Sequence, residues 1–284
     1  GDGLRIVPSW FPYQLDNLSG SFSYADGVVA LAGFRAQHDD AVIRFAADCQ
    51  MRSDGEWAVD LRQLAVDNLE VDRDLLDALP GSIGPAVARL DPDGQYMFDG
   101  SLKLLHRNSH QRPVHASWDF TIETAGGELG GSTRLENLFG GVRLFGTLDD
   151  QGARTEGTIE IDSVQLREKQ LTGIRGPLWI DRGQVLLGRW VQSVSGDATP
   201  HSLVGNCAGG TVQLDAQLIK NSGSRFLAEV RLADADLSRF SKSLTTNGRL
   251  SGRADAWIRL SGELGGVHTW KGNGQVRLRT ADLD

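Results

Sequence analysis

The sequence predicts an all-β protein of antiparallel strands with a few short helices, because apolar and polar residues alternate along most of its 284 residues. One such run is Trp57–Arg62, where Trp57, Val59 and Leu61 share a face. Helical periodicity is confined to short segments, and the 35 glycines fit frequent turns and bulges. We therefore expect an elongated, curled antiparallel sheet that forms an open groove and is built from repeated hairpins.

A hairpin-like segment occurs twice. Leu15–Leu31 and Leu171–Leu187 both read Leu, two residues, an aliphatic residue, one residue and Gly, followed by two short alternating ribbons. Gly27 and Gly183 separate the ribbons, where a tight hairpin turn requires a positive φ. Such repetition indicates a sheet that is extended by copying one unit. We expect residues 1–105 to form a first β-repeat segment, with short helices near 73–90, and residues 106–284 to form a second segment that continues the same sheet.

Strict alternation gives each strand one apolar and one polar face, as in an antiparallel sheet with one solvated side. Trp257 falls on the polar face, between Asp255 and Arg259. The candidate site is the apolar face, and its candidate residues are Trp57, Val59, Leu61, Trp118, Phe120, Ile122, Val212, Leu214, Leu218, Ile258, Leu260, Val276 and Leu278.

Three short helices are predicted. Arg73–Leu79 is followed by the helix breaker Pro80, and Gly84–Leu90 carries Pro85 near its start, where proline is tolerated. The third helix is Ser238–Leu244.

The remaining segments are predicted as loops and turns. His106–Pro113 and Ser193–Pro200 lack periodicity and are expected to be surface loops, the first of them a candidate boundary. Gly272 and Gly274 lack the third glycine and the helix of a dinucleotide-binding loop, so we expect a turn leading into the strand Gln275–Leu278.

The charge balance argues against a nucleic-acid partner. The net charge is −8 and basic residues never occur in runs longer than two, whereas phosphate binding needs clustered Lys and Arg. Two cysteines, Cys49 and Cys207, are too few for a disulfide framework, which leaves free thiols or a single bridge open. The chain starts at Gly1 without Met and stops within a strand-like repeat, so we expect a fragment of a longer chain.

The histidine-rich segment does not predict a metal site. His106, His110 and His115 are spaced like ligands, but Arg107 and Arg112 would oppose a cation, and a solvated loop is the preferred interpretation.

Acidic pairs and serines do not predict catalysis either. For the pairs Asp39-Asp40, Asp72/Asp74 and Asp149-Asp150 we prefer turn and helix-start roles. No G-x-S-x-G motif is present to position a nucleophilic serine. We therefore expect no catalytic residue, no metal and no cofactor, and a protein that is not an enzyme.

Three phrases carry a family resemblance. They are Leu79-Pro80 followed by Leu90–Gly94, then Cys207–Leu214 with its paired glycine, and finally Gly248–Gly252 with Leu260–Gly262 and Gly272–Leu278. In these phrases the chain resembles the AsmA-like group of bacterial envelope proteins, relatives of TamB.

The resemblance implies a periplasmic β-groove that carries phospholipids between membranes or assists outer-membrane assembly. It also implies an inner-membrane anchor in a part of the parent protein outside this chain. The implied partners are phospholipid or another acyl-chain lipid and, through the parent chain, inner- and outer-membrane proteins.

The function depends on what covers the apolar face. If a second sheet covers it, the protein is a structural or adhesive β-sandwich that binds carbohydrate or protein through its loops. If the face stays open, it is an apolar groove suited to acyl chains, because exposed apolar patches of that size mark binding sites. We predict the open groove, and the sandwich is the alternative.

Overall fold

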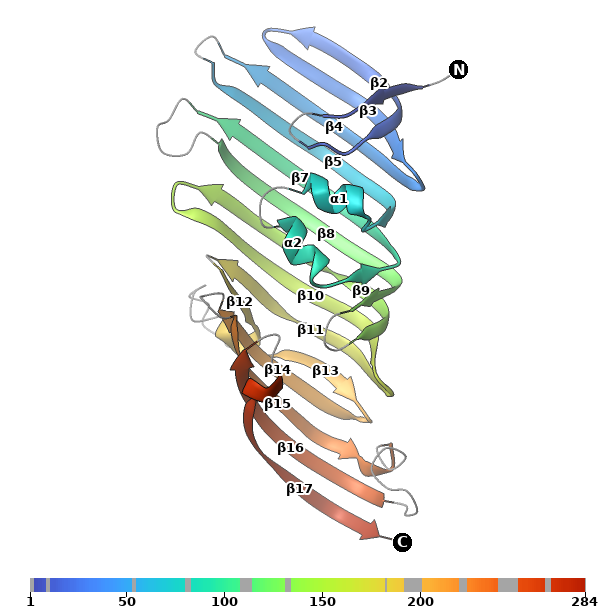
Figure 1. Cartoon of the computed structure of the whole chain (residues 1–284), viewed down its shortest axis with the longest axis vertical. Coiled ribbons are helices and arrows are strands. Elements are labelled where there is room, and N and C mark those ends of the chain that lie inside the picture. Colours follow the sequence, from blue (N-terminus) through green and yellow to red (C-terminus); the bar gives the residue numbers. More distant parts are fainter. Residues whose placement is uncertain are drawn as a thin grey trace. The chain divides into compact units, whose positions relative to one another are not determined.

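The computed structural model describes residues 3–8, 11–52, 55–79, 83–107, 114–130, 134–181, 183–191, 201–219, 224–239, 250–263 and 267–283. Its strands form one antiparallel sheet of 17 strands, accompanied by two short α-helices (Figure 1). The all-β, antiparallel prediction is therefore confirmed. The chain has two compact units, Gly1–Thr155 and Glu156–Asp284.

The first unit is a meander in which β5 pairs with β7, while α1, α2 and β6 lie in the connection between them. The short strand β6 pairs with β8. The loop after His106, suggested above as a boundary, joins the paired strands β7 and β8 within this unit. The elements are β1 (Leu4–Ile6), β2 (Leu15–Ala25), β3 (Val28–His38), β4 (Ala41–Met51), β5 (Trp57–Glu70), α1 (Arg73–Ala78), α2 (Ile83–Ala88), β6 (Pro92–Asp93), β7 (Gln95–His106), β8 (Val114–Leu129) and β9 (Leu135–Asp149).

The second unit contains one strand position that is filled by two short strands. One end of β11 pairs with β12 and the other with β13, and β14 pairs with the same two strands. The chain leaves the sheet after β12 through the short helix η1. The elements are β10 (Gly152–Leu166, which begins in the first unit), β11 (Lys169–Asp181), β12 (Gln184–Leu187), η1 (Gly188–Trp190), β13 (Leu203–Cys207), β14 (Gly210–Ile219), β15 (Arg225–Asp236), η2 (Leu237–Arg239), β16 (Leu250–Glu263), η3 (Val267–Thr269) and β17 (Lys271–Leu283).

Both predicted hairpins are confirmed. Ala25 pairs with Val28 across the two-residue turn Asp26-Gly27, and both turn residues have a positive φ of 51° and 78°. This conformation matches the twist of the flanking strands. The second hairpin joins β11 to β12, with Gly183 at φ 84°.

We predict that Gly27→Val lowers the free energy of unfolding by about 1–2 kcal/mol, because a β-branched residue resists a positive φ. A Cβ at Gly27 would have open space around it, with its nearest neighbour 4.0 Å away, so the effect comes from the backbone alone. Urea unfolding of both variants measures it, with Gly27→Asn as the control because asparagine tolerates this conformation. Equal losses for Val and Asn would contradict the prediction.

Bulges bend the strands without exchanging their faces. The register of β5 shifts between Leu61 and Leu64 and again between Val66 and Leu69. Gln63 and Asn68 lie at these shifts with φ of 54° and 55°. Each bulge adds a residue that bends the strand locally. The alternation resumes after the bulge, so the apolar residues of β5 stay on one side.

Helix α1 begins at Arg73, as the sequence predicts, and ends at Ala78, one residue before the predicted end. The side chain of Asp72 caps it by accepting a hydrogen bond from the Leu75 N–H at 2.7 Å. The helix ends at Ala78, because a helical conformation is disfavoured immediately before proline. The helix-start role predicted for Asp72 is thus confirmed, and Asp39 lies in the turn between β3 and β4.

Other predicted boundaries need correction. Helix α2 starts at Ile83, so Pro85 is its third residue. Only the start of the predicted helix 238–244 is described, as the short helix η2, and 240–249 lie outside the described residues. The loop segments 108–113 and 192–200 lie outside them too.

The predicted turn at Gly272 and Gly274 is wrong. Both residues lie inside β17, paired with Leu260 and Ile258. A Cβ at Gly272 would stand 2.6 Å from Leu260 Cδ2, so this glycine lets a large neighbour pack closely. Glycine is required at position 272 because of this close cross-strand contact, and not because the chain turns there.

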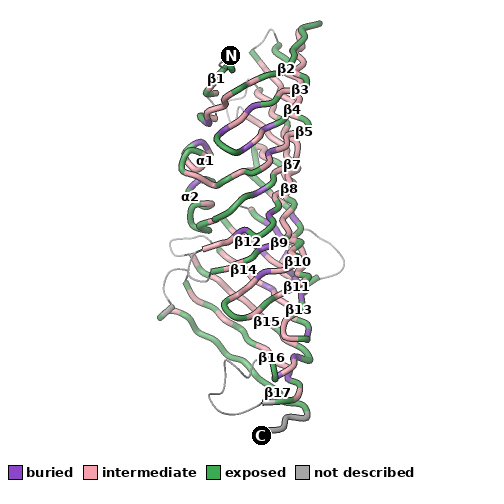
Figure 2. Tube along the Cα trace, turned by 90° about the vertical axis from the view of Figure 1, so that its right-hand side faces the viewer, coloured by how far each residue is buried: buried purple, intermediate pink, exposed green. Residues whose placement is uncertain are grey.

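The buried core of the first unit lies under α1. It comprises Tyr13, Ala41, Ile43, Val66 and Ala78, the last from the helix itself. In Figure 2, β1, α1 and α2 stand on one side of the sheet of this unit. Helix α1 and the segment before β2 therefore cover one end of the sheet.

No helix in the described part of the chain is long and apolar enough to cross a membrane.

Candidate functional site: the apolar faces

The strand registers of the first unit gather its apolar residues into cross-strand rows. Directly paired residues of antiparallel strands share a face. All six predicted residues of this unit therefore lie on one face. The rows are Met51–Trp57–His106–Val114, Cys49–Val59–Leu104–Ala116–Leu148, Ala47–Leu61–Leu102–Trp118–Gly146, Leu64–Gly100–Phe120–Leu144 and Ile43–Val66–Phe98–Ile122–Val142.

The second unit repeats this arrangement over β14 to β17, and its seven predicted residues also share one face. The rows are Val212–Leu232–Ala256–Val276, Leu214–Val230–Ile258–Gly274, Ala216–Ala228–Leu260–Gly272, Leu218–Phe226–Gly262 and Ala254–Leu278.

Each apolar face is partly uncovered, most of all along β2 and β17, whereas the six predicted residues of the first unit are half-buried. Val276 is 63% exposed, Leu278 56% and Ile258 41%. In the first unit the face continues onto β2 with Phe22 and Tyr24, which pair with Leu31 and Val29 and are 76% and 72% exposed. A second sheet would bury these side chains. The described residues of either unit form no second sheet of the kind that the alternative β-sandwich would require.

In the described part of the first unit, α1 and the segment before β2 cover one end of the apolar face. Leu69 of β5 and Leu75 of α1 pack against the core cluster around Tyr13 and Val66. Away from this end, Trp57 stacks on His106, with ring centroids 5.4 Å apart and planes 7° apart. The sequence did not signal that a helix covers part of the face, because α1 is too short for its packing partner to be read from its pattern.

The opposite face carries rows of ion pairs. Arg44 binds Asp67 through two hydrogen bonds, and Arg143 binds Asp119 in the same way. These guanidinium groups hold the pKa of each carboxyl below its usual range. Because these pairs are exposed and screened by water, they add little stability. They keep this face solvated, so the two faces differ sharply in chemistry.

A buried carboxylate joins the split strands of the second unit. Asp215 on β14 is 3% exposed, and its Oδ1 accepts a hydrogen bond from the Arg189 N–H at 2.7 Å. Its Oδ2 accepts from Arg189 Nε at 2.7 Å and from Ser202 Oγ at 3.1 Å. Arg189 also reaches Glu229 on β15. Arg189 follows the end of β12 and Ser202 precedes the start of β13, so the network lies between these two short strands.

The described histidines of the predicted histidine-rich segment, His106 and His115, have different partners. His106 lies in the row with Trp57, and His115 Nε2 is 3.8 Å from Asp150 Oδ1. His110 lies outside the described residues. Cys49 and Cys207 are free thiols, and burial raises the pKa of both.

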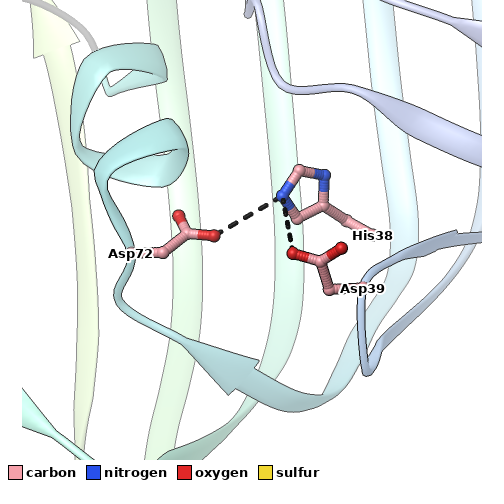
Figure 3. A group of neighbouring side chains, drawn as sticks. All are labelled: His38, Asp39 and Asp72. Atoms are coloured by element: carbon pink, nitrogen blue, oxygen red, sulfur yellow. Dashed lines mark ion pairs between the residues drawn. The ribbon is translucent and has the colours of Figure 1, made fainter.

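A cluster that sequence reasoning missed lies at the edge of the covered end. We call it the His38 cluster: His38 at the end of β3, Asp39 in the next turn, and Asp72 and Asp74 at the start of α1. Figure 3 shows His38, Asp39 and Asp72. The available signals were the phrase His38-Asp39-Asp40 and the acidic helix start. Only the fold brings these two segments together.

The fold and its faces define a class, an all-β protein of one antiparallel sheet whose two units each carry a partly uncovered apolar face. No protein-family model, curated protein or solved structure matches this chain at a significant level of similarity.

Proposed function

We propose that the protein is a non-enzymatic lipid-binding segment whose apolar faces shield lipid acyl chains while headgroups remain in water. The observation that carries the proposal is the set of apolar rows with exposed side chains, such as Val276 and Leu278. An exposed face of this extent is unfavourable unless something occupies it, and in soluble proteins such patches mark binding sites.

Acyl chains suit these faces in size and energetics. The four strands β14–β17 span about 14 Å at ordinary strand spacing. One leaflet of a membrane contributes about 15 Å of hydrocarbon, half of the core thickness. Each methylene that leaves water contributes about 0.8 kcal/mol without directional demands. The rows supply such contacts, and neither binding nor release needs a catalytic residue.

The resemblance to AsmA-like envelope proteins supports the biological setting that we propose. The protein would act in the periplasm, held at the inner membrane by another part of a longer parent chain. Its cargo would be phospholipid or another acyl-chain lipid, in transport between membranes or in outer-membrane assembly. Inner- and outer-membrane proteins would be its partners through the parent chain.

The test is lipid content and uptake. The chain is purified without detergent, extracted with organic solvent, and the extract is analysed for lipids by mass spectrometry. The delipidated protein is then titrated with a phospholipid that carries a fluorescent acyl chain. We expect co-purified lipid and saturable uptake that unlabelled phospholipid competes away. Lipid-free protein that also fails to take up the probe would overturn the proposal, and binding of an oligosaccharide instead would favour the adhesive alternative.

A further inference from the structure

One ring nitrogen of His38 is buried without a hydrogen-bond partner. The histidine is 6% exposed, and its Nδ1 donates to the Gln14 carbonyl at 2.8 Å. The remaining nitrogen, Nε2, has no hydrogen-bond partner. An orphaned buried polar atom of this kind needs an explanation, because leaving it unpaired costs free energy. The Nδ1 bond to a backbone carbonyl is also the arrangement that orients imidazole ligands of metal ions.

Three carboxylate oxygens converge on this nitrogen. Nε2 lies 3.5 Å from Asp72 Oδ2, 3.9 Å from Asp39 Oδ2 and 4.0 Å from Asp74 Oδ2. These separations exceed hydrogen-bond length. The same separations are those expected between atoms that bind one metal ion, because ligand atoms about 2.0–2.2 Å from a zinc ion lie roughly 3–4 Å from one another. The ligand atoms of His38, Asp39 and Asp72 all lie within 4.8 Å of one another.

The electrostatics of the His38 cluster also favour a cation. Across the part of the chain that the structure describes, Asp39, Asp72 and Asp74 form no ion pair with Lys or Arg. The Tyr13 ring packs against the His38 ring at a tilt of 30°, with ring centroids 4.0 Å apart, and Tyr13 belongs to the hydrophobic core beside the cluster.

We propose that His38 Nε2 and the carboxylates of Asp39 and Asp72, assisted by Asp74, bind a divalent transition-metal ion of the zinc type. One imidazole together with carboxylates is a ligand set that binds zinc and other divalent first-row transition-metal ions. The ion would link the turn between β3 and β4 to the start of α1. It would thereby fix the helix over the covered end of the first unit, a role that does not depend on lipid binding.

The test uses the full, untagged chain and Zn²⁺ itself. After treatment with chelator, the protein is titrated with ZnCl₂ by calorimetry, and the zinc absorption edge is recorded on the loaded protein. We expect one ion per chain, nitrogen and oxygen ligands without sulfur, and a higher melting temperature with zinc than with chelator. Failure of the wild-type chain to bind zinc saturably would overturn the proposal.

Substitutions locate the ion. Asp39→Asn and Asp72→Asn are chosen because asparagine tolerates the positive φ of 47° at Asp39 and caps a helix as well as aspartate. Each should weaken zinc binding at least about tenfold. Asp40→Asn in the same turn and Asp77→Asn in the same helix are the controls and should bind within about twofold of wild type. Zinc binding that survives both cluster variants would overturn the assignment, as would equal loss in the controls.

Discussion

Asp215→Ala is expected to lower the free energy of unfolding of the second unit by about 3 kcal/mol. The carboxylate is nearly fully buried and accepts hydrogen bonds from the backbone and side chain of Arg189 and from Ser202. Its removal takes the acceptor from the Arg189 backbone N–H and from Ser202, and leaves the Arg189 side chain with Glu229 as its remaining carboxylate partner. The two hydrogen bonds from Arg189 also hold η1 against β14, so the substitution would release this short helix between β12 and β13.

The control for Asp215 is an exposed ion pair in the same unit. Asp162 has a 76% exposed side chain that lies 4.0 Å from Arg175, so Asp162→Ala should cost less than about 1 kcal/mol. Asp215→Asn should fall between the two, because the amide oxygen still accepts a hydrogen bond without the charge. Urea unfolding followed by circular dichroism and tryptophan fluorescence measures all three. Equal stability of the Asp215→Ala and Asp162→Ala variants would show that the network is not structural.

Val276→Asp is expected to reduce lipid contact with β17 at least about tenfold, whereas Gln275→Asp leaves it unchanged. The two residues are adjacent and exposed, but Val276 lies in an apolar row and Gln275 pairs with Trp257 on the opposite face. The short side chain of aspartate cannot extend past a bound acyl chain into water. Binding of the acyl chain would therefore remove water from the carboxylate, at a cost of several kcal/mol.

Labelling with a photoreactive acyl lipid, followed by mass spectrometry of the peptide that contains β17, gives a local readout of this effect. Binding elsewhere on the chain then does not obscure the loss. Circular dichroism checks that both variants fold, which is expected because β17 pairs with β16 through backbone bonds that neither change removes. Equal labelling of the two variants would show that the apolar face is not where the acyl chain lies.

Local features of the fold were predictable because they depend on neighbouring residues. Period-two alternation is a consequence of strand geometry, so Val59 and Leu61 could be assigned to one face before the strand partners were known. The Asp26-Gly27 turn and the Asp72 cap are likewise local, since a few dihedral angles and one hydrogen bond decide them.

The failures share a physical cause. Gly272 and Gly274 were expected in a turn, but cross-strand neighbours 12 and 16 residues earlier in the chain determine their role. Gln63 and Asn68 give no sequence signal of a bulge, yet they set the register that aligns the apolar rows. Pairing between distant strands decides such features, and one chain segment does not contain that information.

The residue pattern alone was sufficient to predict an all-β chain with two-faced strands and two copies of a hairpin. The three-dimensional packing was needed to show that the rows align within each unit, that no second sheet lies over them in the described residues, and that α1 covers one end in the first unit. It also placed His38 and Asp39 beside Asp72, 33 residues further along the chain. The physical reason is that alternation follows from the backbone of each strand, whereas alignment, coverage and side-chain clusters follow from packing between segments that are far apart in sequence.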